Sequence, residues 1–365
     1  MRFRSAHLLL CRWLSGALGR ELQATDLPVT PAEWQHVLRL SSTHLVTPLL
    51  HWVARTQGYL SSLPPNVVAF LEAVYTLNRD RNRQCLDQLA HLTQALNGIG
   101  VQPVLLKGAA TLVSDLYPTL GERMIGDIDV LIPAPRLPDI LERLADAGYR
   151  RMGTGGALPK AKDFAGFSGH HYPRIDSPDW PVGVELHICL VDSSAARLLS
   201  AEEIFQDAKP LSWRGGEVLL PSPTHFVMHN VIHAFVKDFS FLGWLSLRQL
   251  FEFVHANQIY GERVDWNAVV QRFHELGYRK ALSEYTAFAN AYLGFPPPPG
   301  LTVHGWNRWR PFLHGTRVVA VFRPLSMRTR HLCMGPHRLN KLNKLLTVDL
   351  YSRLWHECVA MFHQT

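Results

Sequence analysis

The sequence predicts an α/β (α+β) fold in which a small mixed sheet is flanked by helical regions on its N-terminal and C-terminal sides. Apolar residues recur at helical spacing over residues 1–98 and again from Ser222 onward, which is typical of amphipathic helices. Between these regions, short apolar runs bounded by turn residues indicate buried strands. Strands and helices mixed within one stretch predict a layered domain built on a single sheet.

The composition is that of a globular protein. Of the 365 residues, 47% are hydrophobic and 18% are charged, a balance that excludes a wholly disordered chain. No apolar run approaches the roughly 20 residues that a membrane-spanning helix needs. The five cysteines are scattered without a Cys-x-x-Cys pair. We therefore expect neither a disulfide framework nor a cysteine-based zinc site, and we expect a cytoplasmic location.

The N-terminal region, residues 1–98, is expected to be helical. Its first residues include two arginines followed by apolar residues, but Arg12 interrupts the apolar run. We therefore expect an amphipathic first helix rather than a signal peptide. A long helix is expected near 65–97, after the pair Pro64–Pro65 and before Gly98, because glycine commonly ends a helix.

Residues 99–221 are expected to form the core domain around the sheet. Its predicted elements, in order, are a strand at 101–106, a helix at 109–117, a strand at 125–133, a helix at 135–147, a loop or hairpin at 149–180 and a strand at 181–191. The last of these alternates apolar residues with others, which is the period-two pattern of a strand.

Two segments follow the core. Residues 222–300 are expected to form helices packed on the core, ending at the run Pro296–Pro299, which cannot continue a helix. Residues 301–365 carry ten Lys or Arg and two acids, a formal charge of +8, whereas the other 300 residues sum to −1. Such a basic segment attracts nucleic acid, an acidic partner or a membrane surface, unless it is a solvated helical face.

The sharpest candidate site is Asp127-Ile128-Asp129 in the predicted strand 125–133. Alternate side chains of a strand share a face, so the two carboxylates point the same way while Ile128 turns to the core. Paired carboxylates repel each other unless a cation lies between them, and Mg²⁺ prefers such hard oxygen ligands. The alternative is an exposed strand edge that happens to carry two acids.

Neighbouring residues favour the metal interpretation. The strand that ends at Leu106 runs into Lys107-Gly108 and a helix, where backbone N–H groups and the lysine can bind a phosphate. Glu185 lies mid-strand in an otherwise apolar alternation, with His187 on the same face. An acid at such a position must be exposed or bound to a partner.

Three motifs together resemble one known family. Leu-Leu-Lys-Gly at 105–108, Gly-Asp-Ile-Asp-Val-Leu-Ile-Pro at 126–133 and Glu-Leu-His at 185–187 look like the uncharacterised nucleotidyltransferase family of the DNA polymerase beta-type superfamily. The resemblance implies a small mixed sheet flanked by helices. It also implies transfer of an NMP from an NTP, expected to be ATP, to a hydroxyl-bearing acceptor with release of pyrophosphate. The acceptor class stays open among small molecules, peptides or proteins, and RNA.

The resemblance further implies Mg²⁺ or Mn²⁺ bound by three carboxylates, which correspond to Asp127, Asp129 and Glu185. Glu185 would also help to activate the attacking hydroxyl. The implied phosphate contacts are Lys107, Gly108 and Arg123. The alternative function is a non-catalytic binding protein of the same fold that interacts with nucleic acid or an acidic partner. The three acids favour catalysis, whereas Gly108-Ala109, where the superfamily usually has Gly-Ser or Gly-Gly, favours the alternative.

Histidines form two weaker candidates. His225, His229 and His233 lie at i, i+4 and i+8 of one predicted helix. That spacing suits a metal, but packed or solvated histidines are the favoured interpretation. The pair His170-His171 either contacts substrate or phosphate or is a loop pair without a role.

The charge distribution predicts that the C-terminal segment carries the polyanion binding of this chain. Deletion of residues 301–365 should remove most of the salt-sensitive retention on heparin or RNA columns, because counterion release scales with the number of Lys and Arg contacts. Replacing the ten Lys and Arg of this segment by Gln keeps the chain length and serves as the matched variant. Equal elution salt for all three proteins would contradict the prediction, and insolubility of the deletion alone would show that the segment packs against the body.

Overall fold

The computed structural model describes residues 3–303, except 115, 154, 165, 168, 192–193 and 240–244. Of the basic segment 301–365, residues 304–365 lie outside the described part. The chain divides into two compact units: unit 1 is Met1–Asn78, Ser246–His255 and Arg279–Thr365, and unit 2 is Arg79–Leu245 and Ala256–Tyr278. The four-part division expected from the sequence remains a prediction. In the described residues, no helix combines the length and the apolar character that crossing a membrane requires.

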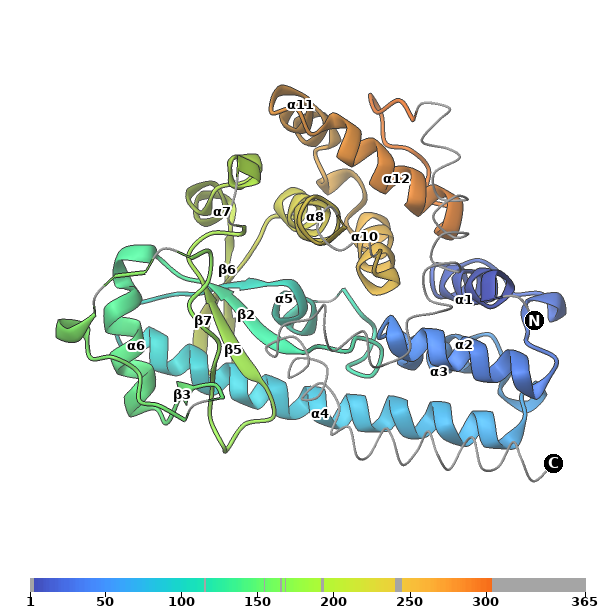
Figure 1. Cartoon of the computed structure of the whole chain (residues 1–365), viewed down its shortest axis with the longest axis horizontal. Coiled ribbons are helices and arrows are strands. Elements are labelled where there is room, and N and C mark those ends of the chain that lie inside the picture. The colour runs from blue at the N-terminus through green and yellow to red at the C-terminus, as the bar shows by residue number, and fades with distance from the viewer. Residues whose placement is uncertain are drawn as a thin grey trace. The chain divides into compact units, whose positions relative to one another are not determined.

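The described part of unit 1 consists of helices and their connections (Figure 1). They are α1 (Phe3–Ala17), η1 (Ala24–Asp26), α2 (Pro31–Thr43), α3 (Thr47–Thr56), η2 (Leu60–Ser62), the first part of α4 (Pro65–Asn97), the first part of α10 (Leu247–Tyr260) and α12 (Arg279–Leu293). Helix α1 packs against α2, α3 and α12. Its buried Trp13 meets Trp34 of α2 edge to face, with 5.7 Å between ring centroids, a geometry that stabilises aromatic pairs.

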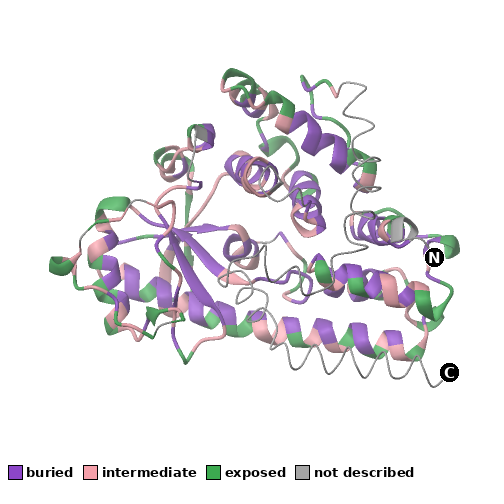
Figure 2. Ribbon diagram, viewed as in Figure 1, coloured by how far each residue is buried: buried purple, intermediate pink, exposed green. Residues whose placement is uncertain are grey.

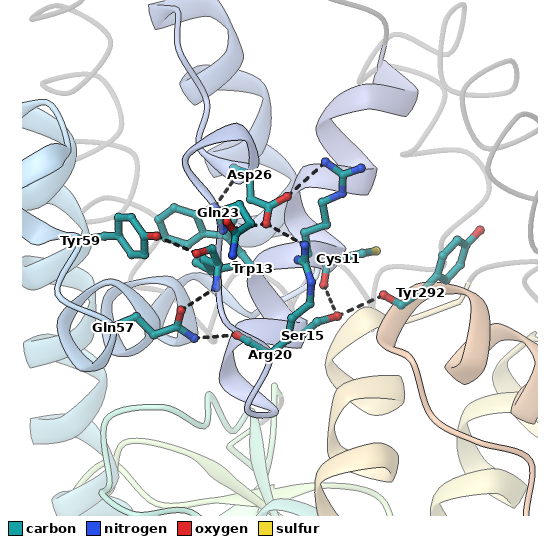
Figure 3. A network of polar contacts seen from close by, with 11 residues as sticks. Cys11, Trp13, Ser15, Arg20, Gln23, Asp26, Gln57, Tyr59 and Tyr292 are labelled. Carbon is teal, nitrogen blue, oxygen red and sulfur yellow. Dashed lines mark hydrogen bonds and ion pairs between the residues drawn. The ribbon is translucent and has the colours of Figure 1, made fainter.

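A buried carboxylate organises the connection between α1 and α2. Asp26 is 1% exposed and accepts hydrogen bonds from Arg12 at 3.2 Å, from Arg20 at 2.8 Å and from the backbone N–H of Gln23 at 3.1 Å (Figure 3). The indole N–H of Trp13 donates to the Asp26 carbonyl at 3.0 Å. A buried carboxylate needs such donors to offset its lost hydration, so these bonds hold the connection in place.

Unit 2 is built on a seven-stranded mixed sheet, which confirms the predicted fold class. Its strands are β1 (Val104–Leu106), β2 (Asp127–Leu131), β3 (Arg150–Arg151), β4 (Ile175–Asp176), β5 (Gly183–His187), β6 (Lys209–Trp213) and β7 (Gly216–Leu220). The order across the sheet is β3-β4-β5-β2-β1-β7-β6. Strand β2 pairs in parallel with β5 and antiparallel with β1, so both neighbours of β2 carry or lead into residues of the candidate site.

The apolar face of the central strands packs against helices of unit 2. The helical elements are the second part of α4, α5 (Lys107–Val113), η3 (Ala134–Arg136), α6 (Leu137–Asp146), η4 (Ala161–Asp163), η5 (Ser194–Leu198), α7 (Ala201–Asp207), α8 (Pro223–Val231), the π-helix η6 (Ile232–Phe239), the last part of α10, η7 (Gly261–Arg263) and α11 (Trp266–Glu275). One core joins α4 and α6 to Ile128, Val130, Val184 and Leu186 (Figure 2 draws these strands as buried). Because strand side chains alternate, Asp129 and Glu185 lie on the opposite face.

The structure differs from the sequence prediction at some element ends. The strand predicted at 101–106 begins at Val104, because the Val101 N–H bonds to the Leu96 carbonyl at 3.0 Å and completes the end of α4. The helix predicted at 109–117 forms at Lys107–Val113. The β6–β7 hairpin was not predicted, because β6 is largely exposed and lacks an apolar alternation. Its two-residue turn, Arg214-Gly215, has φ values of 46° and 76°, as tight hairpin turns require.

The Asp26 network yields a stability prediction. Asp26→Ala should lower the free energy of unfolding by about 2 kcal/mol, because the Gln23 N–H and two guanidinium groups lose their acceptor. Denaturant unfolding measures it. The matched control is Asp80→Ala: Asp80 also pairs with two arginines, Arg79 and Arg83, each at 3.0 Å, but its side chain is 49% exposed. The control should change stability by less than about 0.5 kcal/mol, and equal losses for both variants would show that burial does not matter here.

Candidate functional site

Three adjacent strands bring the predicted acids and a lysine together. The pairing of β1 with β2 sets Leu106 opposite Asp129, and the pairing of β2 with β5 sets Asp129 opposite Glu185. Lys107 follows Leu106 directly and begins α5. Directly opposed side chains on one face of a sheet have Cβ atoms about 5 Å apart. The strand order therefore places Asp129 between Lys107 and Glu185.

Asp129 is the centre of the site. It is 2% exposed, and its Oδ1 accepts hydrogen bonds from Lys107 Nζ at 2.8 Å and from His187 Nε2 at 2.9 Å. Burial raises the pKa of Asp129, but the charge of Lys107 and the bond from His187 lower it more, so the pKa lies below its usual range. Asp129 is therefore ionised at neutral pH and able to bind a cation.

Glu185 and His187 form a close group with Asp129. Glu185 Oε2 lies 3.8 Å from His187 Nε2, and one ligand atom from each of the three residues lies within 4.8 Å of the others. Burial lowers the pKa of His187, and the nearby Lys107 lowers it further, so the ring is neutral at neutral pH. Two carboxylates and a neutral imidazole are compatible with a divalent metal ion.

Asp127 lies on the same strand but pairs with an arginine. Arg174 Nη1 lies 3.3 Å from Asp127 Oδ2, and Arg174 Nη2 donates to the Gly126 carbonyl at 2.8 Å. Among the described residues, the close group of ligand atoms contains Asp129 and Glu185 but not Asp127. Arg174 thus compensates the charge of Asp127 as Lys107 compensates that of Asp129.

Three residues were expected to contact phosphate: Lys107, Gly108 and Arg123. Of these, Lys107 places its ammonium group in contact with the carboxylate of Asp129. Its φ of 47° is a left-handed conformation that costs energy for any residue other than glycine. Gly108 has a packing reason to be glycine, because a Cβ there would lie 2.6 Å from Ile125 Cγ2. Arg123 is 5% exposed and donates to a backbone carbonyl of its own loop.

Helix α8 and the π-helix η6 add a basic side to the site. His229 is 6% exposed and its Nε2 has no hydrogen-bond partner among the described residues. Burial, followed by nearby positive charges, lowers the pKa of His229 well below its usual value. Lys237 Nζ lies 2.9 Å from His170 Nε2, and the rings of His170 and His171 lie 6.0 Å and 5.2 Å from that of His187. π-helical turns are frequent at functional sites.

The other two members of the predicted histidine series have separate partners. His225 Nε2 lies 3.4 Å from Asp207, and His233 Nδ1 lies 3.3 Å from Asp238. In the described part of the chain, the three histidines do not share one close group of metal-binding atoms. This arrangement agrees with the packed interpretation that the sequence favoured.

Sequence reasoning did not select Arg174 or Lys237 as site residues, and it placed His187 on the face of Glu185 without assigning it a role. Arg174 lies in the segment predicted only as loop or hairpin, and no local pattern marks it. Lys237 follows His229 and His233 at four-residue spacing, a pattern that also fits an ordinary helix surface.

Comparison with known proteins supplies a family. A family model described as an uncharacterised nucleotidyltransferase matches residues 30–294. The matched range includes every residue of the site described above, from Lys107 to Lys237. No curated protein and no solved structure matches the chain.

The buried His229 predicts a pH dependence of stability. Its lowered pKa means that the unfolded chain, with a pKa near 6.5, binds a proton before the folded protein does. The free energy of unfolding should therefore fall as the pH drops below about 6.5, with a contribution of up to about 1.4 kcal/mol per pH unit until the folded pKa is reached. Denaturant unfolding between pH 7.5 and 5 measures the slope.

His229→Gln should flatten this slope, whereas His274→Gln, at an exposed histidine of α11 in the same unit, should leave it as in the wild type. An unchanged slope in His229→Gln would show that this histidine is not held neutral by the fold.

Proposed function

The chain belongs to the uncharacterised nucleotidyltransferase family, and from this we propose that it transfers an NMP from an NTP, with ATP preferred, to a hydroxyl-bearing acceptor. The observation that carries the proposal is the pairing of Asp129 with Glu185 across β2 and β5, with Lys107 2.8 Å from Asp129. The two adjacent carboxylates can bind the metal ions that accompany an NTP, and the nearby lysine can bind its phosphates.

The carboxylates have the roles of metal ligands in this proposal. Asp127, Asp129 and Glu185 would hold Mg²⁺ or Mn²⁺, and two acids on adjacent strands offer the oxygen ligands these ions prefer. When bound, the ions would polarise the reacting phosphate and stabilise the attacking and leaving oxygens of an in-line displacement. The bond that forms joins the acceptor oxygen to the α-phosphorus, and the bond that breaks releases pyrophosphate.

The chain's own residues orient the reactants and handle the proton. Glu185 would accept the proton of the attacking hydroxyl, directly or through water, since its carboxylate lies at the ion-binding face. Lys107 would exchange its contact with Asp129 for a contact with the NTP phosphates once metal compensates the acid. Gly108 keeps the start of α5 close to Ile125. Arg123 would add positive charge that attracts the NTP phosphates.

The location and the partners are also part of the proposal. We propose a reducing cytoplasm as the location, because the five cysteines of the sequence form no Cys-x-x-Cys pair. The acceptor would be a small molecule, a peptide or protein, or an RNA, and the +8 segment at 301–365 would contact polyanions.

A non-catalytic binding protein of the same fold is the second candidate. The ion pair of Lys107 with Asp129 favours it, because the lysine occupies the acid that catalysis needs for a metal. Thermal unfolding with and without MgATP separates the two, since a ligand of the folded state raises the melting temperature. A catalytic site should show a shift that requires both metal and nucleotide.

Metal-dependent transfer should fail when a carboxylate is lost. Asp127→Asn, Asp129→Asn and Glu185→Gln should each lower the rate of nucleotide transfer by about 10³-fold, equivalent to about 4 kcal/mol of transition-state stabilisation. Incubation with labelled NTPs and candidate acceptors, read by the mass shift of the product, measures the rate. The control is Asp139→Asn, an exposed acid on α6. Transfer at the wild-type rate in Asp127→Asn or Asp129→Asn would show that the metal assignment is wrong.

A further inference from the structure

The three carboxylates proposed as metal ligands leave one buried group unexplained. His187 is 0% exposed, and its Nε2 faces both Asp129 and Glu185. Its second ring nitrogen, Nδ1, is buried without a hydrogen-bond partner among the described residues. A wholly buried imidazole between two carboxylates needs a reason, because burial without full hydrogen bonding costs free energy.

The spacing of the ligand atoms fits a single metal ion. Two ligand atoms that are each about 2.1 Å from one ion lie about 3.0 Å apart at a right angle and about 3.4 Å apart at a tetrahedral angle. His187 Nε2 lies 2.9 Å from Asp129 Oδ1 and 3.8 Å from Glu185 Oε2. The three ligand atoms are within 4.8 Å of one another, so side-chain shifts of up to about 1 Å would bring all three to one ion.

A second orphaned imidazole lies beside this group. His229 Nε2 is buried without a partner among the described residues, and the charges of Lys107, His187 and Asp129 all act on its pKa. The site therefore contains two buried ring nitrogens with unused hydrogen-bonding capacity.

A nitrogen ligand changes which ion the site prefers. Carboxylate and water ligands suit Mg²⁺, whereas imidazole favours first-row transition ions, whose affinities rise along the Irving–Williams series. His187 is 3.8 Å or less from each of two carboxylates, so it would share an ion with both of them.

We propose that His187 Nε2 joins one carboxylate oxygen each of Asp129 and Glu185 as a third ligand, so that this centre binds divalent first-row transition ions in preference to Mg²⁺. Ligation uses the His187 tautomer with its hydrogen on Nδ1. The hydrogen bond from Nε2 to Asp129 is replaced by the bond to the ion. Lys107 gives up its contact with Asp129 Oδ1 as the ion neutralises that acid. This centre needs no nucleotide, so the inference stands apart from the proposed transfer reaction.

Metal binding to the full-length protein tests the inference without activity. The probes are Co²⁺, followed by its visible absorption, and Mn²⁺, followed by electron spin-echo envelope modulation, with Mg²⁺ as competitor. The wild type should bind Co²⁺ at least about 10-fold more tightly than Mg²⁺. The Mn²⁺ signal should show nitrogen coupling that changes when the histidines carry ¹⁵N.

His187→Gln should weaken Co²⁺ binding by about 10- to 100-fold, change Mg²⁺ binding far less, and remove the nitrogen coupling. The matched control is His91→Gln in the same unit. His91 also has a buried Nδ1 without a partner among the described residues, but its ring contacts Tyr149 and Trp180. The control should retain wild-type binding and coupling.

The inference is overturned if bound Mn²⁺ in the wild type shows no nitrogen coupling, or if the coupling persists in a folded His187→Gln. Should that variant unfold, the ¹⁵N comparison in the wild type still decides. Nitrogen coupling without nucleotide transfer would reject the proposed function and retain the inference. Nucleotide transfer by a protein whose bound metal has only oxygen ligands would reject the inference and retain the proposed function.

Discussion

The buried carboxylate of Asp129 is the constraint on which the site depends. A carboxylate that is 2% exposed remains ionised only where positive charge and hydrogen bonds replace its hydration. Lys107 and His187 both donate to its Oδ1. This demand accounts for two otherwise costly features: the left-handed backbone of Lys107, with φ of 47°, and the complete burial of an imidazole on β5. Sheet pairing supplies the geometry, since Leu106 and Glu185 both lie opposite Asp129.

The same groups that compensate the acids are suited to exchange partners with a ligand. Lys107 neutralises Asp129 and Arg174 neutralises Asp127, so the site is close to charge balance in the absence of metal. A bound cation would release the two basic groups, and a triphosphate would then accept them. Metal and nucleotide binding would in this way favour each other. The metal ion would compensate the carboxylates, and the released Lys107 and Arg174 would compensate the phosphates.

The histidines divide the site into two chemically different sides. Strand β5 contributes His187 to the acidic side, whereas α8 and η6 contribute His229 and Lys237 to a basic side. Burial keeps the rings of His187 and His229 neutral, so they offer lone pairs rather than charge. The positive charge of the basic side therefore comes from Lys237, which contacts His170.

Local patterns in the sequence determined most of the elements and the face on which the acids lie. Period-two alternation put Ile128 and Val184 in the core and Asp129 and Glu185 on the other face, because a strand turns successive side chains to opposite sides. The sheet order, the contact of Lys107 with Asp129, the pairing of Arg174 with Asp127 and the position of His229 were decided only by the tertiary structure. These contacts join segments far apart in the chain, and their partners are selected by the compensation of buried charge, which no local pattern encodes.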